Sequence, residues 1–95
     1  MVVCMAMTAV WLKIDEVRFV QALQEAGKKM DSVDDEMVLD FSSVRRIDPR
    51  ALRAMEEFAG IAADNGVKVV LSDVNVGIYK VLKLVKLAWR FSFVS

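Results

Sequence analysis

The chain contains no histidine, and this absence removes several classes of function at once. Histidine is the most common general base and the most common metal ligand in proteins. Serine–histidine and cysteine–histidine catalytic pairs, and zinc sites that use histidine, are therefore excluded. The glycine-rich motifs G-x-G-x-x-G and G-x-x-x-x-G-K-[ST] of nucleotide-binding proteins are also missing. We therefore predict a protein that is not an enzyme and that needs no cofactor and no metal.

Cysteine is nearly absent as well, since Cys4 is the single one in the chain. It cannot form an intramolecular disulfide, and we expect it to be a small buried hydrophobic residue. It lies in residues 1–12, an apolar run that is shorter than the roughly 20 residues that a membrane-spanning helix needs. The run lacks the basic start of a secretory signal. We therefore expect residues 1–12 to contain a buried strand. Because no targeting segment is recognised, we expect a cytoplasmic protein.

The chain also lacks an excess of charge of either sign, because 13 basic residues balance 13 acidic ones. No overall field attracts nucleic acid or membrane, so we expect no nucleic-acid partner and no membrane insertion. The 95 residues suffice for a single domain, residues 1–95. The hydrophobic fraction of 56% is high for a domain that can bury only a small core. A homodimer would cover part of the apolar surface that remains.

Hydrophobic periodicity and capping residues predict alternating strands and helices. Asp15 is a candidate N-cap of the first helix, and Asn75 is a candidate N-cap of the third. Asp48 followed by Pro49 predicts the start of the second helix, and Gly66 predicts its left-handed end. This order predicts an α/β fold, with a small mainly parallel sheet of about four strands and three helices. The predicted strands are residues 2–10, 37–41, 67–71 and 91–94, and the predicted helices are residues 16–29, 48–65 and 76–88.

Arginines surround the start of the second predicted helix. Arg50 falls in its first turn, Arg45 and Arg46 precede it, and Arg53 follows one turn later. A helix N-terminus carries partial positive charge, so arginines there add nothing to local stability. The cluster could bind an acidic partner surface or a phosphate, because the guanidinium group matches both. The simpler alternative is that these arginines are solvated and paired with nearby carboxylates.

Three segments together resemble the STAS domain, the fold of bacterial anti-sigma factor antagonists. They are residues 37–42 (MVLDFS), the step from Ile47 to Asp48 into a helix, and residues 65–72 (NGVKVVLS). The resemblance covers about residues 13–94 and is strongest over residues 37–73. It implies a non-catalytic interaction module in bacterial signalling and regulation of transcription, which docks an anti-sigma or kinase-like partner.

The resemblance also implies a site, with one departure from the family pattern. In the antagonists, the second serine after an aspartate is phosphorylated by the partner kinase. Asp48 matches that aspartate, whereas Pro49 and Arg50 stand where the two serines would be. Arg50 cannot accept a phosphoryl group, so the usual switch should be missing. Ser42 and Ser43 are nearby secondary candidates for phosphorylation. The expected partner-binding residues are Arg45, Asp48, Pro49, Arg50, Ala51 and Arg53.

Other interpretations remain open from the sequence. Small STAS-like proteins also serve as cytoplasmic subunits of lipid-transporting ABC complexes, where the partner is an ATPase. The arginines could instead bind a nucleotide or another small anion. Lys80, Lys83 and Lys86 form a stripe that is either a solvated helix face or a contact for an acidic partner or anionic lipid. Trp11 and Trp89 are either interface anchors or core residues. A dimer could form through residues 1–12 or 91–94.

Overall fold

The computed structural model describes residues 9–33 and 36–94. Within these residues the chain alternates between strands and helices, as the sequence predicts. The predicted strand at residues 2–10 lies mostly outside the described residues, and Cys4 lies wholly outside them. The elements in chain order are β1 (Ala9–Lys13), α1 (Phe19–Lys28), the 3-10 turn η2 (Met30–Ser32), β2 (Glu36–Asp40), α2 (Pro49–Asp64), β3 (Lys68–Ser72), α3 (Val76–Leu84), the 3-10 turn η3 (Ala88–Arg90) and β4 (Ser92–Val94).

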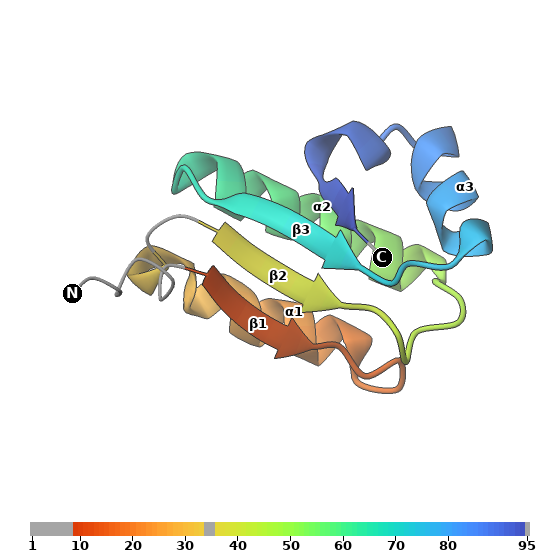
Figure 1. The fold of residues 1–95 in the computed structure, drawn as a ribbon, viewed down its shortest axis with the longest axis horizontal. Helices are drawn as coiled ribbons and strands as arrows, with labels where there is room; N and C mark the ends of the chain where they lie inside the picture. Colours follow the sequence, from red (N-terminus) through yellow and green to blue (C-terminus); the bar gives the residue numbers. More distant parts are fainter. Residues whose placement is uncertain (1–8, 34–35, 95) are drawn as a thin grey trace.

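The described strands form one parallel sheet in the order β1-β2-β3-β4. Each strand therefore lies beside the next one in the chain, and each helix is a crossover between neighbours. Right-handed crossovers that all step in one direction place their helices on the same face of the sheet. Figure 1 shows α1 and α2 side by side behind the sheet, with α3 beyond the carboxyl end of β3. The predicted α/β fold is confirmed.

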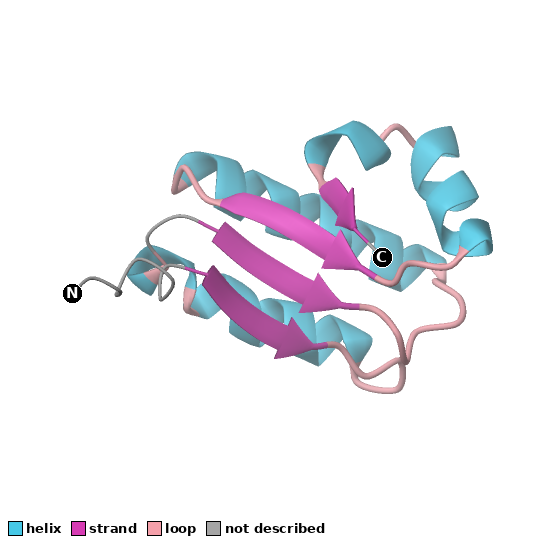
Figure 2. Cartoon of the chain, in the orientation of Figure 1, coloured by secondary structure: helices cyan, strands magenta, loops and turns pink. Residues whose placement is uncertain are grey.

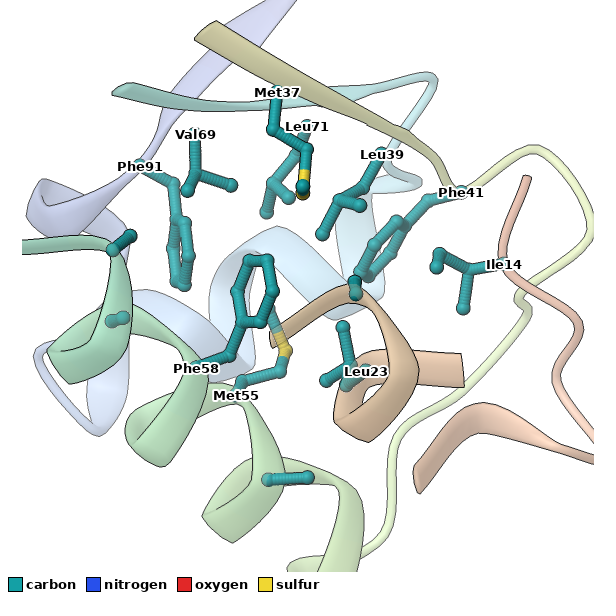
Figure 3. Packing of buried hydrophobic residues seen from close by; sticks show 14 of the residues in the cluster. Ile14, Leu23, Met37, Leu39, Phe41, Met55, Phe58, Val69, Leu71 and Phe91 are labelled. Carbon is teal, nitrogen blue, oxygen red and sulfur yellow. The ribbon is translucent and has the colours of Figure 1, made fainter. Parts of the chain in front are cut away.

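The main core lies between the sheet and helices α1 and α2. Alternate residues of each strand point toward the helices, because side chains alternate between the two faces of a strand. Figure 3 shows Met37, Leu39 and Leu71 from the sheet converging on side chains from α1 and α2. Leu23 of α1 and Phe58 of α2 are each 2% exposed. The apolar stripes that predicted these two helices are therefore the surfaces that pack against the sheet.

The start of α1 differs from the prediction, because the helix begins at Phe19 rather than residue 16. Asp15 does not cap it. The Asp15 side chain accepts a hydrogen bond from the Val17 N–H at 3.0 Å, and the Asp15 carbonyl accepts from the Arg18 N–H at 3.2 Å. These bonds close a turn that ends where the helix starts. Asp15 therefore shapes the connection between β1 and α1.

The end of α3 also differs from the prediction, because the helix ends at Leu84 rather than residue 88. Lys86 has a φ of 62°, and the Leu87 N–H donates to the Leu82 carbonyl at 2.8 Å. This left-handed residue with its return hydrogen bond terminates a helix even without glycine. Val85, which helical spacing places on the buried stripe, is 46% exposed as a result.

Both tryptophans are on the surface, so the core interpretation of them is wrong. Trp11 on β1 is 63% exposed and Trp89 in η3 is 77% exposed. Trp89 follows the turn that ends α3, where the chain reverses before entering β4. Indole side chains this exposed are available to contact other molecules.

Candidate functional site

The loops after β1, β2 and β3 gather at one end of the molecule. Figure 2 shows these loops along the edge to which the first three strand arrows point. The carboxyl ends of parallel strands meet at a common edge, and ligands of open α/β sheets usually bind there. The arginine-rich segment singled out in the sequence is the loop from β2 to α2, so it belongs to this edge.

Two buried side chains fix the loop from β2 to α2 on the core. Phe41 is fully buried and Val44 is 2% exposed, and the Val44 N–H donates to the Phe41 carbonyl at 2.9 Å. The Phe41 ring packs edge-on against Phe19 of α1, with ring centroids 5.5 Å apart. Ser42 and Ser43 lie between these anchors and are exposed.

Asp40 holds the first turn of this loop. Its carboxylate accepts a hydrogen bond from the Ser42 N–H at 2.9 Å. That bond and a second from the Ser42 hydroxyl lower the pKa of Asp40 below its ordinary value of 3.8. Desolvation opposes the shift, and the nearby positive charge of Lys13 adds a smaller contribution to it. Asp40 is therefore held in its charged form as a structural acceptor.

Glu16 and Asn75 hold the middle of the loop from two other connections. The Glu16 carboxylate, from the turn before α1, accepts from the N–H groups of Arg45 at 2.5 Å and Arg46 at 3.3 Å. The Asn75 side-chain amide, from the loop before α3, donates to the carbonyls of Arg45 at 3.0 Å and Val44 at 3.4 Å. The loop backbone is thus held by hydrogen bonds from both sides. The arginine side chains therefore project from a backbone whose position is fixed.

The start of α2 follows the sequence prediction. The Asp48 carboxylate accepts from the Ala51 N–H at 2.8 Å, and Pro49 occupies the first helical turn. Asp48 is therefore confirmed as the N-cap. The first turn of α2 carries no acidic residue, and Arg50 is exposed there.

A groove of about 740 Å³ runs between the start of α2 and the first turns of α1. Arginines of three segments line it, namely Arg18 before α1, Arg46 in the loop and Arg50 on α2. A second groove of about 340 Å³ continues along α1 and α2 and shares Val20, Gln24 and Arg50 with the first. The full lining of the first groove is Glu16, Val17, Arg18, Phe19, Val20, Gln21, Gln24, Arg46, Ile47, Asp48, Arg50 and Ala51.

The structure brings most of the predicted site residues to these two grooves. Asp48, Arg50 and Ala51 line the first, and Pro49, Arg50 and Arg53 line the second. Ala51 is 5% exposed and contributes to the wall, whereas the other four are exposed. The remaining predicted residues, Arg45, Ser42 and Ser43, are exposed beside the grooves and line neither.

Sequence reasoning missed two residues that shape the site. Glu16 binds a backbone 29 and 30 residues away, and Arg18 belongs to the opposite wall of the groove. Neither has a local pattern that marks this role. The sequence does predict Asn75 as a helix cap, and its Oδ1 accepts from the Ile78 N–H at 2.8 Å. Its second role, toward the Arg45 carbonyl, appears only in three dimensions.

The arginines of the two grooves offer hydrogen-bond donors to anions, and the carboxylates of Glu16, Asp48 and Glu57 also line the grooves. Guanidinium groups bind carboxylates and phosphates in a forked geometry, and Gln21 and Gln24 add amide donors and acceptors. Among the residues that the structure describes, no cluster of three or more histidine, cysteine or acidic side chains could hold a metal ion. No helix in the described ranges is long and apolar enough to cross a membrane.

The fold is similar to that of solved structures. The crystal structure of a proposed anti-sigma factor antagonist from Thermotoga maritima, TM1081, superposes with a TM-score of 0.74 at 18% identity. The match covers 90% of this chain and 78% of that one. The NMR structure of TM1081 gives a TM-score of 0.75 at 17% identity, with coverage of 93% and 74%. The chain thus has the STAS-like fold of an anti-sigma factor antagonist. No protein-family model matches the sequence. No curated protein matches it significantly.

Proposed function

We propose that this protein is a non-catalytic interaction module that acts in bacterial signalling or regulation of transcription. It docks an anti-sigma or kinase-like protein through Arg45, Asp48, Pro49, Arg50, Ala51 and Arg53. The observation that carries the proposal is the arginine-lined groove between α1 and α2, built on a loop whose backbone is held by Glu16 and Asn75. The STAS-like fold, shared with a proposed anti-sigma factor antagonist, supports it.

The shape of the site favours a protein over a small anion. The arginines are distributed along two connected open grooves rather than around one enclosed cavity. A small ligand pocket normally buries most of its ligand. An acidic helix or loop of a partner could instead reach Arg46, Arg50 and Arg53 in succession. Arginine is enriched at the energetic centres of protein interfaces, which agrees with this use.

This protein should not be regulated by phosphorylation at the position of the family's serine, because Arg50 stands there and has no hydroxyl group. Ser42 and Ser43 are exposed and remain the alternative acceptors. A phosphate on Ser42 would add negative charge close to the charged Asp40 carboxylate, which disfavours it. We therefore expect constitutive binding. Incubation of the protein with ATP and its captured partner, followed by mass mapping, should find no phosphoserine.

Capture of partners from the source cells tests the docking surface. The double variant Arg50→Glu/Arg53→Glu should lose the partner that the unaltered protein captures, because both substitutions reverse charge along the groove. Lys28→Glu is a control for a charge reversal elsewhere, since Lys28 is an exposed cation at the far end of α1 and lines neither groove. Circular dichroism of each variant verifies the fold.

The identity of the captured protein separates the remaining alternatives. An anti-sigma factor or kinase-like protein supports the proposal. An ABC-transporter ATPase would replace it with the transport role, and unchanged capture by the double variant would exclude this surface. Heat release that saturates when nucleotides are titrated into the protein alone would favour the small-anion sensor.

A further inference from the structure

Charge is divided sharply along the chain. All 13 acidic residues lie between residues 15 and 73. From residue 74 to the end there is no aspartate or glutamate, whereas Lys80, Lys83, Lys86 and Arg90 all fall there. The overall neutrality therefore conceals a cationic segment, which comprises α3, η3 and β4.

The same segment exposes large apolar side chains. Leu84 is 81% exposed, Trp89 77%, Val76 68% and Val85 46%. Successive residues of an α-helix are rotated by about 100°, which places Val76, Lys80, Lys83 and Leu84 together on the outer face of α3. Buried Ile78 and Leu82 occupy the opposite face. The outer face thus combines lysines with aliphatic side chains and has no acidic residue.

Aromatic side chains continue this surface onto η3 and β4. The Tyr79 ring packs edge-on against Phe93, with centroids 5.0 Å apart, and the Lys83 ammonium lies 5.7 Å from the Tyr79 ring. The Arg90 guanidinium lies 5.5 Å from the Trp89 ring. A shallow cavity of about 360 Å³ lies among Tyr79, Lys83, Lys86, Ala88, Trp89 and Phe93. Lys83 belongs both to the outer face of α3 and to the lining of this cavity, so the cations and apolar groups of the two elements adjoin one another there.

We propose that this α3–η3 surface binds the anionic face of a lipid bilayer, with Trp89 and Leu84 entering the headgroup region. Peripheral membrane surfaces combine Lys and Arg with Trp, Phe and Leu, because lipid headgroups are anionic and the layer beneath is apolar. Tryptophan favours this boundary, since its ring is apolar and its N–H is polar. A bilayer matches both kinds of exposed group at once.

Other polyanions match this surface less completely. An RNA strand would use the lysines and aromatic rings, but it offers no apolar layer for Leu84 and Val76. An acidic protein would need an apolar patch set among its carboxylates. The surface is also separate from the grooves at α1 and α2, because none of its residues lines them. Lipid binding and the docking proposed above can therefore succeed or fail independently.

The two tryptophans provide an internal comparison. The variant Trp11→Phe keeps Trp89 as its sole tryptophan, and the variant Trp89→Phe keeps Trp11. Vesicles of phosphatidylglycerol and phosphatidylcholine should shift the emission of Trp89 to the blue and leave that of Trp11 unchanged. Vesicles of phosphatidylcholine alone should shift neither, because this zwitterionic lipid carries no net charge. Equal shifts of both tryptophans, or none, would overturn the proposal.

Charge substitutions test the same surface by vesicle sedimentation. Lys80→Gln and Lys83→Gln should each weaken binding to the anionic vesicles by roughly fivefold, the usual effect of one cation near such a membrane. Lys28→Gln and Lys68→Gln are matched controls on α1 and β3 and should not weaken it. Equal losses in test and control variants would show a merely global charge effect and contradict the proposal. A Trp89 shift with polyglutamate or RNA but not with vesicles would replace lipid with that partner.

Discussion

At the scale of single residues, the acidic groups around the site act on backbone N–H groups. The carboxylates of Glu16, Asp40 and Asp48 accept from Arg45 and Arg46, from Ser42, and from Ala51 respectively. Local carboxylates were the simplest partners to expect for the arginines. These three carboxylates bind the backbone, and the side chains of Arg46 and Arg50 are exposed at the groove.

Replacement of the α2 cap tests the last of these contacts. Asp48→Ala removes the acceptor of the Ala51 N–H, and we expect it to lower the free energy of unfolding by about 1 kcal/mol. Asp48→Asn keeps a side-chain oxygen and should cost much less. Urea denaturation monitored by circular dichroism measures both. Equal losses for the two variants would contradict a capping role.

The pH dependence of stability tests the contact of Asp40 with Ser42. The pKa of Asp40 is lowered in the folded state, so its contribution to stability is complete above its ordinary pKa of 3.8. The contribution is lost as the pH falls through the lowered value. Asp40→Asn should therefore be less stable than the unaltered protein at pH 7, and the difference should shrink below about pH 4. A difference that persists to pH 2 would exclude ionisation as its source.

At the scale of elements, one loop links the starts of all three helices. Glu16, in the turn before α1, and Asn75, the N-cap of α3, both bind the backbone of the loop that leads into α2. Phe19 of α1 adds the ring contact with Phe41 at the same place. The groove is therefore a product of how three connections meet rather than of any one helix.

A single substitution can separate the two roles of Asn75. Asn75→Asp keeps the oxygen that caps α3 but loses the N–H donor to the carbonyls of Val44 and Arg45. Amide hydrogen exchange should accelerate in residues 42–47, where the loop loses its support, and stay nearly unchanged in α3. Equal acceleration in both segments would show that the two roles cannot be separated.

At the scale of the whole molecule, the order of the strands decides where the core can be. Consecutive neighbouring strands place α1 and α2 on one face, so a single layer of side chains carries most of the apolar packing. Met37, Leu39 and Leu71 belong to that layer and are each at most 1% exposed. A domain of this size has little stability to lose, so its core positions are sensitive.

Truncation of the central strand measures that sensitivity. Leu39→Ala should lower the free energy of unfolding by about 2–5 kcal/mol, because it removes apolar contacts and leaves a cavity. Lys68→Ala, at an exposed position of β3, should change it by about 0.5 kcal/mol or less. Chemical denaturation provides both values. A loss below about 1 kcal/mol for Leu39→Ala would mean that the core closes around the gap.

The local sequence determined the parallel α/β order, the N-caps Asp48 and Asn75, and the left-handed residue Gly66 that follows α2. These features depend on contacts over a few residues, so composition and spacing carry them. The tertiary structure decided where α1 begins, where α3 ends, and that both tryptophans face outward. It also placed Glu16 on the loop before α2 and Arg18 across the groove from Arg50. Contacts between residues some 30 positions apart leave no periodic pattern in the chain, and only the packing of the helices on the sheet brings them together.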